Sequence, residues 1–126
     1  MKLFLQLTTT AFVLCIACAH AASSPVGEIT DVVVEENGIG QKTKGCESFS
    51  VTASQVREFF ERAVLVSGRQ YHDYFQHGPC YAQGTLKSRY DTWKWEIRNL
   101  GSGTLTATNG DVFQFGNPDE EVSPED

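Results

Sequence analysis

The chain has 126 residues, of which 40% are hydrophobic and 11% aromatic, and its net charge is -6 at pH 7. This length corresponds to one modest globular domain and leaves no room for the two-domain folds that bind dinucleotides. Because 10 basic residues stand against 16 acidic ones, the chain lacks the basic surface that a nucleic-acid backbone requires. We therefore expect no nucleic-acid partner.

The first 21 residues have the pattern of a signal peptide. Lys2 precedes an apolar run over residues 3–17, and small residues follow at Ala19 and Ala21. This spacing suits cleavage after Ala21, and the run is shorter than the roughly 20 apolar residues of a membrane-spanning helix. The pattern predicts a periplasmic or secreted protein without a membrane span.

A second interpretation of the leader includes a lipid anchor. Residues 15–18 (Cys-Ile-Ala-Cys) resemble a lipoprotein cleavage box in which Cys18 is acylated, although Cys15 stands where leucine is usual. This alternative predicts an outer-membrane lipoprotein with a structural role in the envelope. Both interpretations place the folded part of the chain outside the cytoplasm.

Two of the four cysteines, Cys46 and Cys80, lie after the predicted leader. Two thiols in an oxidising compartment allow a single pairing, so we predict a Cys46–Cys80 disulfide. Closing this loop removes unfolded-state entropy worth about 3–4 kcal/mol in the chain-entropy model. The bond also occupies both sulfur nucleophiles, which disfavours cysteine catalysis.

Charge divides the rest of the chain into three parts. Residues 22–45 carry four acids and two bases, residues 46–116 carry seven of each, and residues 117–126 carry five acids and no base. The last part holds two prolines and one aliphatic residue, too little apolar surface to order itself. We expect a partly extended acidic segment over 22–45, a globular domain over 46–116 and a disordered acidic tail over 117–126.

The region after Cys46 contains the signals of one amphipathic helix. Thr52 and Gln55 have the spacing of a capping box, in which each side chain satisfies a free backbone N–H of the other residue. Gly68 is the expected end of the helix. Apolar residues recur on one helical face at Val56, Phe59, Phe60, Ala63 and Val64.

The residues after Cys80 predict an antiparallel meander. Residues 92–99 alternate, with Trp93, Trp95 and Ile97 on one side and charged residues on the other. Residues 81–89 form the expected preceding strand, 104–107 a following one, and 31–35 a further strand before the helix.

The hairpin around Asn109-Gly110 has two possible registers. A three-residue loop pairs Leu105 with Phe113 and keeps both apolar side chains on one face, so we predict this register. The predicted class is α+β, with one amphipathic helix packed on an antiparallel β-meander of about four strands and one disulfide.

Residues 69–80, between the predicted helix and meander, are the candidate binding segment. Tyrosine and arginine bury large areas with few rotatable bonds and dominate interface hot spots. The disulfide through Cys80 would hold this loop rigid, which lowers the ordering cost of association. We predict that it binds another protein through Arg69, Tyr71, His72, Tyr74, His77 and the following Tyr81.

The same segment supports an enzymatic alternative, a small metal-dependent or acid–base hydrolase that uses His72, Asp73 and His77. However, the five-residue spacing of the two histidines is not the i, i+4 spacing that places two imidazoles on one helix face. The sequence also contains no nucleophile elbow and no spaced carboxylate pair. We therefore favour a binding module and predict no catalytic residue, metal ligand or cofactor.

In its size, leader and single predicted disulfide, the chain is similar to small exported bacterial proteins that bind and block an enzyme. Periplasmic lysozyme inhibitors and immunity proteins of secreted toxins are examples. The resemblance implies an inhibitor or immunity protein that acts on another protein in the periplasm. It assigns no role to any individual residue.

Overall fold

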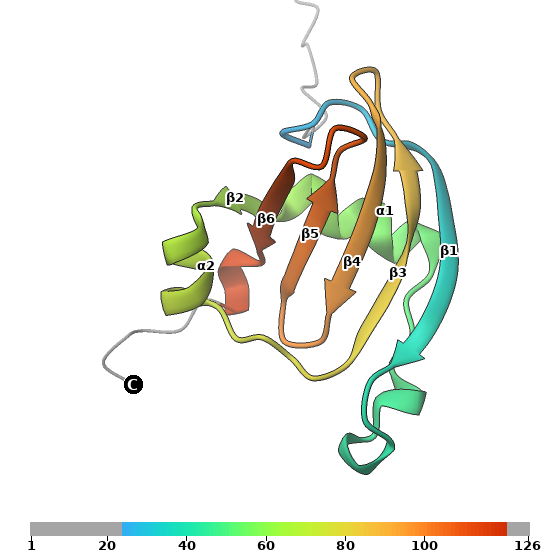
Figure 1. Cartoon of the computed structure of the whole chain (residues 1–126), viewed down its shortest axis with the longest axis vertical. Coiled ribbons are helices and arrows are strands. Elements are labelled where there is room, and N and C mark those ends of the chain that lie inside the picture. The colour runs from blue at the N-terminus through green and yellow to red at the C-terminus, as the bar shows by residue number, and fades with distance from the viewer. Residues whose placement is uncertain (1–23, 121–126) are drawn as a thin grey trace, which may run out of the picture.

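The computed structural model describes residues 24–120 (Figure 1). The predicted signal peptide, the alternative acylation site at Cys18 and residues 121–126 lie outside the described residues. Within 24–120, no helix is long and apolar enough to cross a membrane. The elements are β1 (Thr30–Ile39), η1 (Lys42–Lys44), η2 (Cys46–Ser48), α1 (Ala53–Arg62), β2 (Val64–Val66), α2 (Gly68–Tyr74), β3 (Tyr81–Lys87), β4 (Thr92–Arg98), β5 (Ser102–Thr106), β6 (Val112–Gly116) and η3 (Pro118–Glu120).

The strands form one antiparallel sheet in the order β1-β3-β4-β5-β6-β2. The predicted α+β class is confirmed, but the sheet has six strands rather than about four, and there are two α-helices rather than one. The difference lies in the two edge strands, β1 and β2, which flank the four-stranded meander. β1 is longer than the strand predicted there and pairs with β3, and the unpredicted β2 pairs with β6.

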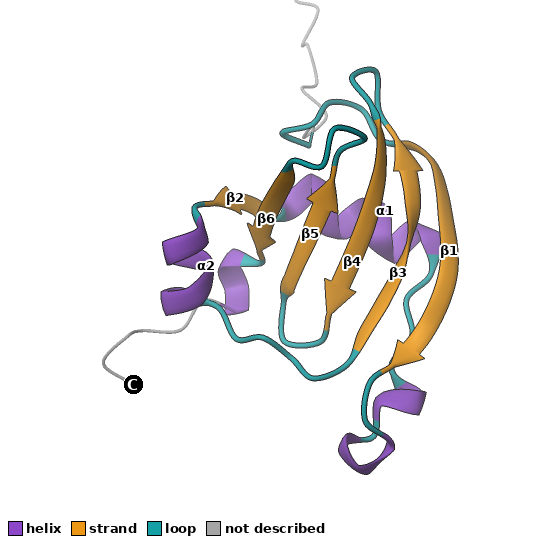
Figure 2. Ribbon diagram, in the orientation of Figure 1, coloured by secondary structure: helices purple, strands orange, loops and turns teal. Residues whose placement is uncertain are grey.

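Helix α1 begins at the predicted capping box. The Thr52 hydroxyl accepts a hydrogen bond from the Gln55 backbone N–H (3.2 Å), and the Gln55 side chain accepts one from the Thr52 N–H (2.9 Å). Val56 and Phe60 are fully buried, as the apolar face predicts. The helix lies against one face of the sheet (Figure 2).

The predicted continuation of this helix through Val64 to a stop at Gly68 is wrong. The chain leaves the helical conformation at Ala63, and Val64 lies in β2 with 43% of its surface exposed. β-branched residues fit a strand better than a helix, and hydrogen bonds to β6 satisfy the backbone here.

Gly68 is instead the first residue of a second helix, α2, in the segment predicted to be a loop. A second capping box explains this helix. The Ser67 hydroxyl accepts from the Gln70 N–H (3.2 Å), and the Gln70 side chain accepts from the Ser67 N–H (2.9 Å). The sequence from Ser67 to Gln70 has the same spacing as Thr52 to Gln55.

The core lies between α1 and the sheet. The predicted alternation of β4 is confirmed, since Trp93, Trp95 and Ile97 are all buried. The predicted register of the β5–β6 hairpin is also confirmed, because Leu105 pairs with Phe113. One step along the same face, the ring of Phe115 packs edge-to-face against that of Phe60, with 5.3 Å between the centroids.

The predicted disulfide between Cys46 and Cys80 is present, and both residues are buried. It joins η2 to the residue immediately before β3, with 4.9 Å between the two Cα atoms. The bond therefore fixes the end of the segment that connects α2 to the sheet.

Candidate functional site

The predicted binding segment consists of α2 and a connection that we call the strap (residues 75–80). The strap leaves α2 and runs along the lower ends of the central strands to β3 (Figure 1). It starts where the Phe75 ring fills the space beside Gly116 on β6 and ends at the Cys80 disulfide. The strap therefore runs past the ends of the strands, from β6 to β3.

Two side chains, those of Arg98 and Asn99, form hydrogen bonds with the backbone of the strap at its middle and its end. The Gly78 carbonyl accepts a hydrogen bond from the Arg98 guanidinium (3.1 Å), and the Cys80 N–H donates to the Asn99 side chain (3.0 Å). Gly78 also lies so close to Asn99 that a side chain at 78 would overlap it. The glycine thus permits close contact between the strap and the end of β4.

Tyr71 lies beneath this surface rather than on it. Its side chain is 5% exposed, and its ring packs edge-to-face with His77 at a centroid distance of 4.3 Å. The His77 Nε2 atom is 3.4 Å from the Tyr71 carbonyl oxygen. Tyr71 therefore anchors α2 and supports His77, which is itself exposed.

Three neighbouring polar residues lie on the exposed side of α2. The Asp73 carboxylate contacts the His72 Nδ1 atom at 3.1 Å and the Arg69 Nε atom at 3.5 Å. The hydrogen bond from His72, followed by the hydrogen bond and charge of Arg69, lowers the pKa of Asp73 below its ordinary value. These side chains are open to water, so the pairing contributes little to stability.

Tyr81 joins this surface through a residue that was not among the predicted site residues. The Arg98 guanidinium lies 4.7 Å above the centre of the Tyr81 ring and 2.9 Å from a Glu96 carboxylate oxygen. The two strands place Tyr81 directly opposite Arg98. Because the Arg98 guanidinium also donates to the Gly78 carbonyl, this one side chain on β4 contacts both β3 and the strap.

The structure does not gather the three residues of the enzymatic alternative into one hydrogen-bonded set. His72 contacts Asp73, whereas His77 contacts the backbone and ring of Tyr71. Tyr74, the remaining predicted contact residue, is half-buried at the end of α2. Over residues 24–120, no group of three or more histidine, cysteine, aspartate or glutamate side chains could hold a metal ion.

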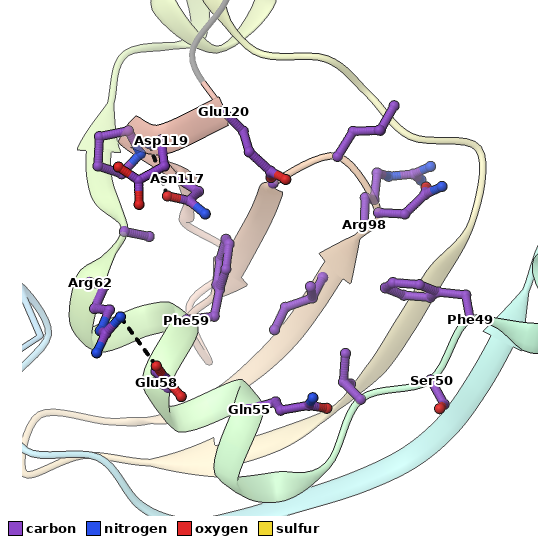
Figure 3. Close-up of a pocket in the computed structure, with 17 residues that line it drawn as sticks. Phe49, Ser50, Gln55, Glu58, Phe59, Arg62, Arg98, Asn117, Asp119 and Glu120 are labelled. Carbon is purple, nitrogen blue, oxygen red and sulfur yellow. Dashed lines mark hydrogen bonds and ion pairs between the residues drawn. The ribbon is translucent and has the colours of Figure 1, made fainter.

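A pocket of about 500 Å³ lies between α1, the β4–β5 turn and η3 (Figure 3), and it adjoins the strap surface at Arg98 and Asn99. No local pattern in the sequence indicates this pocket, because its walls come from four separate stretches of the chain. Its lining is Phe49, Ser50, Val51, Gln55, Glu58, Phe59, Arg62, Ala63, Ile97, Arg98, Asn99, Leu100, Gly101, Asn117, Pro118, Asp119 and Glu120.

The floor of this pocket is apolar. Phe59 projects from α1 toward the end of the sheet, and Ile97 and Ala63 are buried around it. A side chain at Gly103 would come within 2.7 Å of the Phe59 ring, so the glycine leaves the space in which the ring sits. Leu100, in the β4–β5 turn, remains 47% exposed.

The rim of the pocket is mostly acidic. Glu58 pairs with Arg62 at 3.3 Å, and both side chains are largely exposed. Asp119 and Glu120 lie on the opposite side of the pocket, and neither forms an ion pair with any residue from 24 to 120.

Comparisons of the chain with protein-family models, with curated proteins and with solved structures gave no match. The choice of a function for this chain therefore depends on the geometry of its own residues.

Proposed function

We propose that this chain is an exported protein-binding module that acts as an inhibitor or immunity protein on another protein, in the periplasm or outside the cell. The observation that carries the proposal is the strap, which is fixed by Phe75 at its start, by Arg98 in its middle and by a disulfide at its end. A segment already held in one conformation loses little entropy when it binds a partner.

The exposed side chains along this rigid segment suit a protein interface. Arg69 and His72 on α2 and His77 on the strap face water, and the Tyr81–Arg98 stack continues the surface on the sheet. Aromatic and arginine side chains bury large areas at little entropic cost, which is why they dominate interface hot spots. In this proposal Tyr71 supports the surface from below.

Export is part of the same proposal. The signal-peptide pattern of residues 1–21 and the buried Cys46–Cys80 bond both fit a protein that folds in an oxidising compartment. Mass spectrometry of the N-terminus of the exported protein distinguishes cleavage after Ala21 from acylation of Cys18.

Affinity capture tests the proposal. The exported protein is immobilised and used to capture partners from an envelope extract of the source organism, beside the triple variant R69A/H72A/H77A. We expect the wild type to retain a partner that the triple variant binds at least tenfold more weakly. Because these side chains are exposed, the variant should keep the wild-type circular dichroism spectrum.

The matched control is the triple variant S54A/R57A/T92A, which replaces three exposed residues on α1 and at the end of β4 farther from the strap. It should retain the partner as the wild type does. Equal recovery of the same partner by wild type and R69A/H72A/H77A would show that α2 and the strap are not the binding surface.

A further inference from the structure

We infer that the pocket between α1 and η3 is a second binding site, and that it takes a segment of a partner protein in which a lysine or arginine flanks a large apolar side chain. The site adjoins the strap at Arg98 and Asn99, but the inference does not depend on binding at the strap. Its basis is the combination of an apolar floor, an acidic rim and walls that are already fixed.

The pocket is large enough for more than one side chain. Its volume of about 500 Å³ falls within the range of roughly 300–1,000 Å³ that ligand sites occupy. Phe59 is half-buried and Leu100 is 47% exposed, and both line the pocket. Covering this surface with an apolar group of a partner would remove it from water.

The negative charge of the rim favours a positively charged ligand. Glu58, Asp119 and Glu120 contribute three negative charges to the lining, and Arg62 is already paired with Glu58. The other lining cation, Arg98, directs its guanidinium to Glu96 and the Tyr81 ring rather than to the acids of η3. The rim thus has two carboxylates available for a cation, and it repels an acidic ligand.

The acidic wall is attached to the sheet. The Asn117 N–H donates to the Gly101 carbonyl (2.8 Å), and the Asn117 side chain accepts from the Asp119 N–H (3.0 Å). The Glu120 side chain lies against Gly101, where positive φ (85°) and the missing side chain leave room for it. The backbone of η3 and the Glu120 side chain therefore have defined positions before a ligand binds, which lowers the entropic cost of binding.

These features together define the chemistry of the occupant. A lysine or arginine satisfies the two carboxylates, while an adjacent phenylalanine or leucine covers Phe59 and Leu100. A small amine would leave the floor in contact with water, and an apolar segment without a cation would leave the carboxylates without a counter-charge. A basic, apolar-bearing segment of a protein meets both requirements.

Fluorescence anisotropy with short labelled peptides tests the inference. The probe is acetyl-Gly-Lys-Phe-Lys-Gly-amide, and its two comparison peptides replace either both lysines by glutamate or the phenylalanine by glycine. We expect each comparison peptide to bind at least tenfold more weakly than the probe. Binding of the probe should also weaken as salt rises, because the rim is open to water.

Variants of the protein identify the site. D119N/E120Q should lower the affinity for the probe about tenfold. The control E35Q/E36Q removes the same charge from exposed positions on β1 and should leave the affinity within twofold. Backbone amide NMR shifts on adding the probe should fall on Phe59, Leu100 and Asn117.

Two results would overturn the inference: equal weakening by both double variants, or binding of the glutamate peptide as tightly as the lysine peptide. The first would mean that net charge alone attracts the probe, and the second that the acidic rim does not choose the ligand. Neither result bears on the strap, whose capture experiment uses other residues.

Discussion

Gly84 lies directly opposite Trp95 in the β3–β4 pairing, and the indole ring occupies the space that a side chain at position 84 would fill. The indole N–H donates to two carbonyls, those of Val33 and Thr85, each at 3.1 Å. The missing side chain thus allows one tryptophan to connect β1, β3 and β4.

Replacing this glycine should destabilise the sheet. In G84A the new methyl group would overlap the Val33 carbonyl oxygen and press on the indole ring. We expect a loss of about 3 kcal/mol in the free energy of unfolding, measured by urea denaturation. The control G68A, at the start of α2, meets only an ordinary contact of 3.4 Å with the Gln114 side chain, and its stability should be unchanged or higher.

Removing the disulfide should destabilise the domain by releasing the strap. The sequence separation of 34 residues corresponds to about 3–4 kcal/mol in the chain-entropy model. We expect C46A/C80A to lose this amount in urea denaturation, and its strap amides to exchange with solvent faster than those of α1. Unchanged exchange at the strap would show that Phe75 and Arg98 hold it without the bond.

The capping box at Ser67 should control whether α2 forms. α2 has only seven residues, so one lost cap affects a large part of it. We expect S67A to cost about 1 kcal/mol of stability and to raise amide exchange within α2 selectively. The equivalent change T52A should cost a similar amount but raise exchange at the start of α1.

Asp91 should make the stability of the domain sensitive to acid. Hydrogen bonds from the Thr108 N–H first, then from the Thr108 hydroxyl and the Thr92 N–H, lower the pKa of Asp91 below its ordinary value of 3.8. Because the folded pKa is the lower one, the contribution of this carboxylate is complete above the unfolded value and is lost as pH falls through the folded value.

We therefore expect the free energy of unfolding of the wild type to decline more steeply than that of D91N as the pH falls below 3.8. Urea denaturation at a series of pH values measures both curves. T108V, which keeps the backbone donor but lacks the hydroxyl, should lie between them. Parallel curves for wild type and D91N would contradict this prediction.

The features that the sequence predicts well depend on neighbouring residues. The capping box of α1 spans four residues, and the alternation of Trp93, Trp95 and Ile97 needs only a period of two. The β5–β6 register follows from the same kind of pattern, because a slip of one residue would expose Leu105 or Phe113. α2 could have been predicted in the same way from Ser67 and Gln70.

Other features depend on residues that are far apart in the chain. β2 has only three residues, too few to show a period, and it forms because β6 supplies its partner. The pocket is built from four stretches that come together only when α1 packs on the sheet.

The pairing of β2 with β6 has a consequence for biosynthesis. Among the described strands, β6 is the last in chain order, so β2 has no native strand partner until β6 has been synthesised. Contacts so distant in sequence form slowly, which delays closure of the sheet. Such a delay would suit a polypeptide that, under the proposed export, must be threaded across a membrane before it acquires its native shape.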